Sequence, residues 1–191
     1  MKKIAESSKK FWKFLNEDSW QSWLVSLVFA FVIIKFIFFP AMSLVTGSPL
    51  PLVVVESCSM YHSNSFDKWY EQNGLWYENK KINEDSFTEF PFKNGLNKGD
   101  IILVYNRGNF KVGDIIIFSS DFAHPLIHRV VEKGNKIGTK GDNNFDQLEA
   151  EKNINSEDVL GRAIVRIPGL GWIKLIFFEG SRPERQRGFC K

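Results

Sequence analysis

One segment of the sequence is apolar on every face. Residues 20–39 (WQSWLVSLVFAFVIIKFIFF) contain a single charge, Lys35, close to the carboxyl end of the run. As an α-helix rising about 1.5 Å per residue, such a run reaches about 30 Å, the hydrocarbon thickness of a bilayer. A helix buried in a globular core usually has one apolar stripe, which makes that alternative the weaker one. The pattern predicts a transmembrane anchor over residues 20–39.

The flanks of this run predict its orientation. Five lysines precede it, whereas residues 40–66 contain no Lys or Arg. Because basic flanks stay on the cytoplasmic side, residues 1–19 are expected in the cytoplasm and residues 40–180 outside it, followed by a basic tail over residues 181–191. We therefore expect a single-pass protein of the cell membrane. A signal peptide cleaved near Ala41-Met42-Ser43 is the alternative, although the apolar run is longer than a usual signal h-region.

Beyond the stiff link Gly47-Ser48-Pro49-Leu50-Pro51, short runs rich in Val and Ile alternate with Gly-containing turns, which is typical of strands. The predicted strands are residues 52–55, 101–105, 115–118, 126–131 and 159–167. Lys98-Gly99-Asp100 and Val112-Gly113-Asp114 each precede Ile-Ile, which we interpret as two Gly-Asp turns that open strands. The fold class is therefore mainly β, a barrel or sheet.

Residues 61–98 form an insertion of different texture, in which Trp, Tyr and Phe alternate with charges. We expect one or two short helices there. The aromatic residues are expected to form a satellite hydrophobic cluster packed on the β-domain, with a cap over a cleft or a contact with the lipid interface as the alternatives.

Composition removes several function classes. Eighteen Phe and six Trp are too many for a disordered chain, and two Cys are too few for a disulfide scaffold. We expect Cys58 to be a small buried filler in a domain that does not depend on oxidation. A net charge of +3, with no basic stripe, excludes nucleic acid as a partner. No spacing of Cys, His or acidic residues predicts a metal site, and no cofactor is expected.

Three short segments suggest the chemistry: Glu56-Ser57-Cys58-Ser59-Met60, Leu126-Ile127-His128-Arg129-Val130-Val131, and Lys136-Ile137-Gly138-Thr139-Lys140-Gly141-Asp142-Asn143-Asn144. A serine nucleophile needs a base, which a neutral imidazole supplies at physiological pH, and a carboxylate to orient that imidazole. Each segment alone is typical of an ordinary turn or strand; their combination and order are what indicate a serine hydrolase.

The chain resembles the type I signal peptidases in one amino-terminal anchor and in a set of short motifs. These motifs are the Ser57-Cys58-Ser59-Met60 box, the two Gly-Asp turns, the His128-Arg129-Val130 box, the Thr139 to Asn144 box and Gly161-Arg162. It is most similar to the branch found in archaea and in the endoplasmic-reticulum signal peptidase complex, where His replaces the bacterial general-base Lys. These motifs cover most of the chain outside the insertion.

The resemblance implies a role for each matching residue. It makes Ser59 the nucleophile, His128 the general base, Asp142 the acidic partner and Ser57 a contributor to the oxyanion hole. The box departs from the family pattern, since Cys58 stands where relatives have Gly, and position 148, where relatives often have a second Asp, is Leu. Asp146 therefore stays open as the acid that orients His128.

Two other bases are weaker candidates. His62 lies only three residues from Ser59, so it would need an unusually tight turn. Lys140 would require a pKa lowered by burial. The resemblance aligns the family's base with His128 instead.

The implied function is cleavage of signal peptides from exported preproteins, with the lipid bilayer and the export machinery as further partners. We expect the substrate to add as an extended strand beside Val53, Val54 and Val55, although a plain core role for these valines fits equally well. A non-catalytic membrane-anchored module that binds exported polypeptides is the alternative, and a self-cleaving repressor of related fold is disfavoured by the membrane span.

Overall fold

The computed structural model describes residues 2–191, and the chain divides into two compact units, residues 1–45 and residues 46–191. Met1, the first residue of the predicted cytoplasmic segment, lies outside the described residues. The two units are described in turn.

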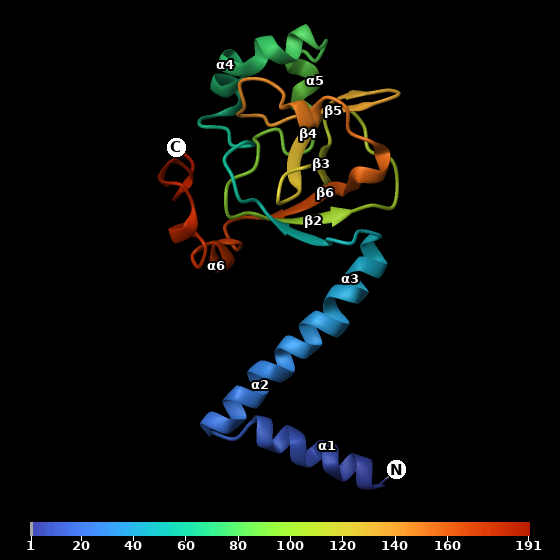
Figure 1. Cartoon of the computed structure of the whole chain (residues 1–191), viewed down its shortest axis with the longest axis vertical. Coiled ribbons are helices and arrows are strands. Elements are labelled where there is room, and N and C mark those ends of the chain that lie inside the picture. The colour runs from blue at the N-terminus through green and yellow to red at the C-terminus, as the bar shows by residue number, and fades with distance from the viewer. Residues whose placement is uncertain (1) are drawn as a thin grey trace. The chain divides into compact units, whose positions relative to one another are not determined.

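The amino-terminal unit is a pair of helices joined by a short turn (Figure 1). Helix α1 covers Lys2–Leu15 and α2 covers Trp20–Ile33. Ser19 caps α2, because its hydroxyl accepts a hydrogen bond from the backbone N–H of Ser22. The Ser22 hydroxyl in turn donates to the carbonyl oxygen of Phe14 at 2.6 Å, which ties the end of α1 to the start of α2.

The apolar helix continues beyond the predicted span. After α2 comes a π-helical turn, η1, over Ile34–Phe38, and then α3 over Phe39–Thr46. Pro40 explains the π-turn: its ring displaces the preceding helical turn and it has no N–H to donate, so the hydrogen-bond pattern widens just before it. The continuous helix Trp20–Thr46 has 27 residues and is long and apolar enough to cross a membrane by length and composition.

The second unit is built on one antiparallel sheet of six strands, in the order β1-β2-β6-β3-β4-β5. The strands are β1 Leu52–Val54, β2 Ile101–Tyr105, β3 Ile115–Phe118, β4 Leu126–Lys133, β5 Ile137–Lys140 and β6 Val159–Ile167. Five of these were predicted nearly to the residue, and β5 was missed. The pairings of the described residues leave β1 and β5 as the edge strands, so they give a sheet and do not establish a closed barrel.

Both predicted Gly-Asp turns are present and use the same geometry. Gly99 and Gly113 have φ values of +90° and +95°, which favour glycine. The following carboxylates accept backbone N–H groups three residues upstream, Asn97 to Asp100 at 2.7 Å and Lys111 to Asp114 at 2.9 Å. Each turn thereby fixes the start of a central strand.

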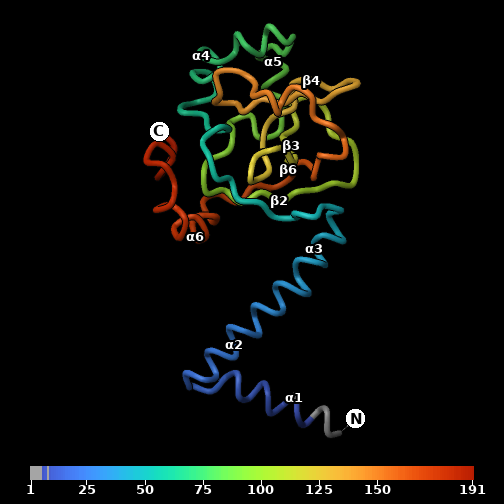
Figure 2. The backbone as a smooth tube through the Cα atoms, viewed as in Figure 1, coloured from blue at the N-terminus to red at the C-terminus, as the bar shows by residue number. Residues whose placement is uncertain are grey.

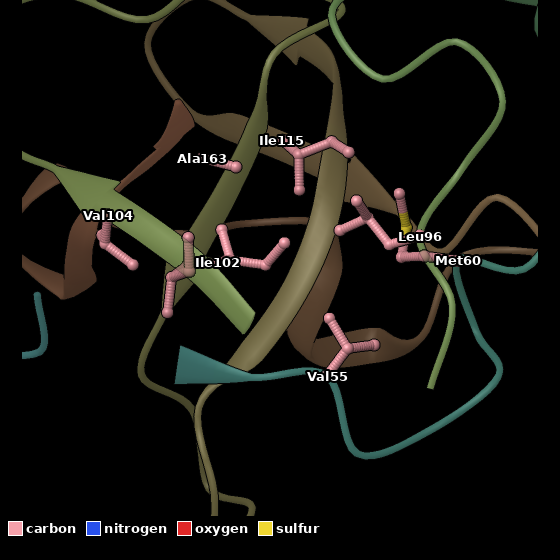
Figure 3. Packing of buried hydrophobic residues seen from close by; sticks show 8 residues of the cluster. Val55, Met60, Leu96, Ile102, Val104, Ile115 and Ala163 are labelled. Atoms are coloured by element: carbon pink, nitrogen blue, oxygen red, sulfur yellow. The ribbon is translucent and has the colours of Figure 1, made fainter. Parts of the chain in front are cut away.

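Side chains from segments far apart in the sequence pack together in one hydrophobic cluster. Figure 3 shows this cluster, in which Val55 and Met60, on either side of the predicted nucleophile, pack with residues of β2, β3 and β6. Its buried members are Val55, Met60, Leu96, Ile102, Val104, Ile115, Ile117 and Ala163. The loop that carries Ser59 is thus held at both ends by the core.

The insertion folds as predicted, into two helices with their own hydrophobic cluster. Helix α4 covers Phe66–Asn79 and α5 covers Glu84–Thr88, and the two lie together at one end of the sheet (Figure 1). Trp69, Tyr77 and Phe87 are buried there with Val131 of β4, so the cluster is a satellite packed on the β-domain.

The remaining helices are short. They are α6 Trp172–Leu175 and the 3₁₀ turns η2 Glu149–Glu151, η3 Ser156–Asp158, η4 Glu179–Ser181 and η5 Glu184–Gln186. The apolar segment around α6 is fixed on the sheet domain, because Leu175 is buried and the Gly171 N–H donates to the Gly99 carbonyl oxygen at 2.7 Å.

Candidate active site

Ser59 lies in the loop that follows β1, and its hydroxyl faces two other polar groups. The Ser59 Oγ is 2.9 Å from Nε2 of His128 and 3.0 Å from Oγ of Ser57, both within hydrogen-bond distance. The backbone of Ser59 is held by Asn143, whose N–H donates to the Ser59 carbonyl oxygen at 2.7 Å. Three predicted segments, the Ser box, the His box and the Gly-Asp-Asn-Asn box, therefore meet at this loop.

His128 lies on a strand that has partner strands on both sides. It is on β4, opposite Ile116 of β3, and its side chain is only 3% exposed. A central strand offers little freedom to a side chain, so the ring is presented to Ser59 by the sheet itself and not by a mobile loop. This arrangement suits a base that must hold one orientation.

The carboxylate next to His128 belongs to Glu151, a residue the sequence analysis did not single out. Nδ1 of His128 lies 2.6 Å from Oε1 of Glu151, within ion-pair distance, although the contact does not meet the geometry of a hydrogen bond. The Glu151 side chain is fully buried at the end of η2, and its other oxygen accepts the Leu148 N–H at 2.6 Å. Glu151 belongs to no sequence motif, because it comes close to His128 of β4 only through the path of residues 141–151 in the folded chain.

Asp142, predicted as the partner of His128, is occupied elsewhere. It is fully buried and accepts hydrogen bonds from Nε and Nη2 of Arg129, from Nε2 of His62 at 3.0 Å and from the Tyr77 hydroxyl at 2.9 Å. Its carboxylate is saturated by these donors. His128 is not among the described contacts of Asp142, and the carboxylate described next to the His128 ring is that of Glu151, so the expectation that Asp142 orients His128 stays a prediction with Glu151 as its rival.

The charges around Asp142 determine its ionisation. Burial alone would raise the pKa of Asp142, but the Arg129 guanidinium and the hydrogen bonds from His62 and Arg129 outweigh it and hold this pKa well below its usual range. Burial and the Asp142 charge together raise the pKa of the Tyr77 hydroxyl well above its usual value. The lowered pKa favours the ionised form of Asp142, whose contacts with His62 and Tyr77 join the aromatic insertion to the sheet.

Asp146, the alternative acid, also has described partners other than His128. It accepts hydrogen bonds from Nε1 of Trp76 at 2.8 Å and from the Gln147 N–H at 2.7 Å. The hydrogen bonds from Gln147 and Trp76 lower the pKa of this carboxyl. Its described partners therefore belong to helix α4 of the insertion and to its own turn.

The two weaker candidate bases have structural partners. His62 pairs with Asp142 and stacks on Trp69 with ring centroids 3.6 Å apart. The Lys140 ammonium donates to the carbonyl oxygen of Gly141 at 3.1 Å and lies 5.1 Å from the Trp76 ring centroid. Burial lowers the pKa of Lys140. Neither side chain contacts Ser59 among the described contacts.

Cys58 corrects another expectation. Instead of filling the core as a free thiol, it forms a disulfide with Cys190. The domain therefore does use oxidation, which is typical of proteins outside the cytosol. The sequence offered only the even count of two cysteines as a signal, since their separation of 132 residues gives no local pattern.

A cleft of about 330 Å³ opens in front of the Ser59 hydroxyl. Ser57, Ser59 and His128 line it together with Val54, Val55 and Arg182, and the loop Phe122-Ala123-His124-Pro125 forms the opposite wall. Val53, expected to line the groove with its neighbours, is not among the residues that line the cleft and packs against the core cluster to which Val55 also belongs. The free edge of β1 borders this cleft.

Comparison with known proteins gives a consistent group of relatives. No family model matches the chain. The signal peptidase complex catalytic subunit SEC11 of Eremothecium gossypii is 31% identical over 160 residues, 76% of this chain and 77% of the relative. The subunit of the same name from Lachancea thermotolerans is 30% identical over 161 residues, 76% of this chain and 77% of the relative. That from Verticillium alfalfae is 26% identical over 158 residues, 75% of this chain and 73% of the relative.

Proposed function

We propose that Ser59 and His128 cleave signal peptides from exported preproteins. The chain belongs to the family of signal peptidase complex catalytic subunits, which are type I signal peptidases of the endoplasmic-reticulum and archaeal branch. It is thus a serine endopeptidase. The observation that carries the assignment of these residues is the 2.9 Å contact between Ser59 Oγ and His128 Nε2.

The proposed mechanism follows from the order of the groups. Nε2 of His128 removes the Ser59 proton as the hydroxyl oxygen attacks the scissile carbonyl, which forms a tetrahedral oxyanion. Glu151 favours the tautomer with the proton on Nδ1 and then stabilises the imidazolium. His128 returns the proton to the leaving amine, and water hydrolyses the acyl-enzyme by the same steps. Glu151 thus replaces Asp142 and Asp146 as the proposed orienting acid.

Ser57 and the free edge of β1 complete the proposed site. The Ser57 hydroxyl, 3.0 Å from the nucleophile oxygen, is near enough to donate to the oxyanion together with the Ser59 backbone N–H. An extended substrate adding to the edge of β1 would place alternate side chains in the cleft beside Val54 and Val55. A cleft of this limited volume favours small side chains next to the scissile bond.

We further propose that residues 20–39 anchor the protein in a cell membrane, with residues 1–19 in the cytoplasm and residues 40–180 outside. The 27-residue helix Trp20–Thr46 is about 40 Å long at 1.5 Å per residue, enough to cross the hydrocarbon layer and project from it. The Cys58–Cys190 disulfide supports a location of the second unit outside the cytoplasm.

The relatives are named as subunits of a complex, and we extend this property to the present chain as part of the proposal. Purification of the full chain from its own membranes in a mild detergent tests the assembly: co-purifying stoichiometric subunits support it, and an active monomer overturns it. The export machinery stays a predicted partner.

The proposed chemistry is tested with the full-length protein in detergent and a preprotein substrate. Ser59→Ala and His128→Ala should each lower kcat by about 10⁴-fold or more while the preprotein still binds. Ser63→Ala is the matched control, since Ser63 is an exposed serine near the same loop, and it should cleave at the wild-type rate. Wild-type cleavage by Ser59→Ala would overturn the assignment and favour a binding module.

A further inference from the structure

The last residues of the chain are joined covalently to the loop that carries the proposed nucleophile. Cys190 forms its disulfide with Cys58, the residue between Ser57 and Ser59. Figure 2 shows the carboxyl-terminal segment, in red, running beside the teal segment that follows β1. The disulfide therefore attaches the carboxyl-terminal segment to the residue directly before Ser59.

Side chains of the same segment hold the other end of this loop. Arg182 donates from Nη1 to the Glu56 carbonyl oxygen and from Nη2 to Oε2 of Glu56, both at 2.8 Å. Lys174 of α6 donates to Oε1 of Glu56, also at 2.8 Å. Both cations lower the pKa of the Glu56 carboxyl against the effect of its burial. A backbone oxygen and both carboxylate oxygens of Glu56 are therefore fixed from the carboxyl-terminal side.

The carboxyl-terminal segment is itself fixed to the sheet domain. The Lys98 ammonium donates to Oε2 of Glu179 at 2.9 Å and to the Gln186 carbonyl oxygen at 2.7 Å, and the Lys98 side chain is only 1% exposed. The rings of Trp172 and Phe189 pack with centroids 4.6 Å apart, just before Cys190. Lys98 adjoins the Gly99-Asp100 turn, so the segment spans from the start of β2 to the Ser59 loop.

The loop needs such support. Residues 55–59 belong to no strand or helix, and Ser57 is exposed. Because catalysis by a serine–histidine pair depends on alignment, a displacement of about 1 Å costs about 10²-fold in rate. Asn143 donates hydrogen bonds to the carbonyl oxygens of Ser59 and Cys58. Together with the carboxyl-terminal segment, it holds the backbone from Glu56 to Ser59.

We propose that residues 179–190, the brace, are a positioning element of the active site: through the Cys58–Cys190 disulfide and the Arg182–Glu56 contacts, the brace holds the Ser59 hydroxyl in register with His128. This proposal rests on the proposed function of Ser59 and His128 and adds the residues that align them. Since the disulfide forms only under oxidising conditions, the site becomes fully aligned only after residues 46–191 have left a reducing compartment.

Reduction provides the direct test, because it breaks one bond in the native protein. Dithiothreitol transfers two electrons and two protons to the Cys58–Cys190 bond, giving two thiols and the cyclic disulfide of the reagent. The variant Cys190→Ser lacks the same disulfide, so dithiothreitol should not change its cleavage rate. Arg185→Gln is the matched control, since Arg185 lies in the brace but makes none of the contacts described above.

The measurements separate alignment from stability. Cleavage is followed well below the melting temperature of every variant, together with hydrogen exchange of the peptide covering residues 56–61 and of β2 as an internal reference. Reduced wild type and Cys190→Ser should lose about 10- to 100-fold in kcat with KM within about twofold, and exchange in residues 56–61 should accelerate while that of β2 is unchanged. Reoxidation should restore the wild-type kcat.

Two results would overturn the brace. One is a kcat of Cys190→Ser within twofold of wild type while only the melting temperature falls, which would make the disulfide purely stabilising. The other is unchanged exchange in residues 56–61 after reduction. If wild type cleaves no preprotein, the proposed function fails, and the exchange comparison still decides whether the brace fixes the loop.

Discussion

The domain contains two buried histidine–carboxylate pairs that resemble each other closely in their contacts. In one, Nδ1 of His128 lies 2.6 Å from Oε1 of Glu151, and in the other, Nε2 of His62 lies 3.0 Å from Oδ2 of Asp142. All four side chains are 3% exposed or less. Burial and a nearby carboxylate therefore do not distinguish a reactive histidine from a structural one.

The difference lies in what the second ring nitrogen and the carboxylate face. The free nitrogen of His128 faces the Ser59 hydroxyl, whereas that of His62 has no hydrogen-bond partner among the described residues and its ring stacks on Trp69. Asp142 pairs with the guanidinium of Arg129, while Glu151 accepts hydrogen bonds from the Leu148 N–H and the Thr139 hydroxyl. In the proposed mechanism the His128 pair passes a proton to and from the Ser59 hydroxyl, whereas the His62 pair joins the insertion to the sheet.

The largest difference between the pairs should appear when each histidine is removed. His128→Ala should lower kcat by about 10⁴-fold or more and leave the melting temperature close to wild type, because it removes the base of the proposed reaction. His62→Ala should show the reverse, with a lower melting temperature and kcat within about tenfold at low temperature. Steady-state cleavage and thermal unfolding of both variants measure this. A larger loss of kcat in His62→Ala than in His128→Ala would reverse the assignment of the two pairs.

Substitutions of the two carboxylates, Glu151 and Asp142, should differ in the same way, with a smaller effect on kcat than the histidine substitutions. Glu151→Gln keeps the shape of the side chain but favours the wrong His128 tautomer, so kcat should fall about 10³-fold. Kinetics at several pH values check that this loss persists across the pH range and is not a shift of the optimum. The matched variant Glu149→Gln, an exposed neighbour in η2, should cleave normally. Normal cleavage by Glu151→Gln would remove Glu151 from the mechanism.

Asp142→Asn should act on stability. It removes one partner of a buried ion pair and leaves Arg129 uncompensated, which costs about 3–5 kcal/mol in the free energy of unfolding. Denaturant titration measures the cost, and the folded fraction should retain kcat within about tenfold. If Asp142→Asn unfolds normally but loses about 10³-fold in kcat, Asp142 and not Glu151 is the acid that serves the base.

The low pKa of Asp142 also predicts a pH dependence. Because the folded pKa is depressed, the resulting stability is fully present above the unfolded value of 3.8 and is lost as the pH falls below it toward the folded value. Wild type should therefore lose stability steeply below about pH 4, and Asp142→Asn should lose less over the same interval. Equal slopes for the two proteins would show that Asp142 is not ionised in the folded state.

The sequence predicted the elements whose signals are local. Four strand ranges rich in Val and Ile and the Val-rich run before Ser59 were found from their composition, and the two Gly-Asp turns from their repeated pattern. β5 was missed because its four residues, Ile137–Lys140, include Gly and Lys and carry no β-signature of their own. It is a strand because β4 offers it an edge, and that partner is known only from the fold.

The site divides along the same line. Ser59 and His128 were predicted from motifs with a known order, and the structure brings them within 2.9 Å. Glu151 was missed because its approach to His128 depends on the path of the chain after β5, and the Cys58–Cys190 disulfide because its residues are 132 positions apart. For Asp142 the motif left the partner open, since its carboxylate pairs with Arg129, the neighbour of His128 in sequence.

Asp146 gives the smallest expected effect and the sharpest check on motif-based reasoning. Its carboxylate accepts from Trp76 Nε1 and from its own turn, and both partners would still find the amide oxygen of Asn. Asp146→Asn should therefore change kcat by less than twofold and the free energy of unfolding by less than about 0.5 kcal/mol, as for most surface substitutions. Cleavage and denaturant unfolding measure both. A loss of 10²-fold or more in kcat would mean that residues 143–148 rearrange to bring this acid to His128 when substrate binds, and that the contact with Glu151 belongs to the unliganded form alone.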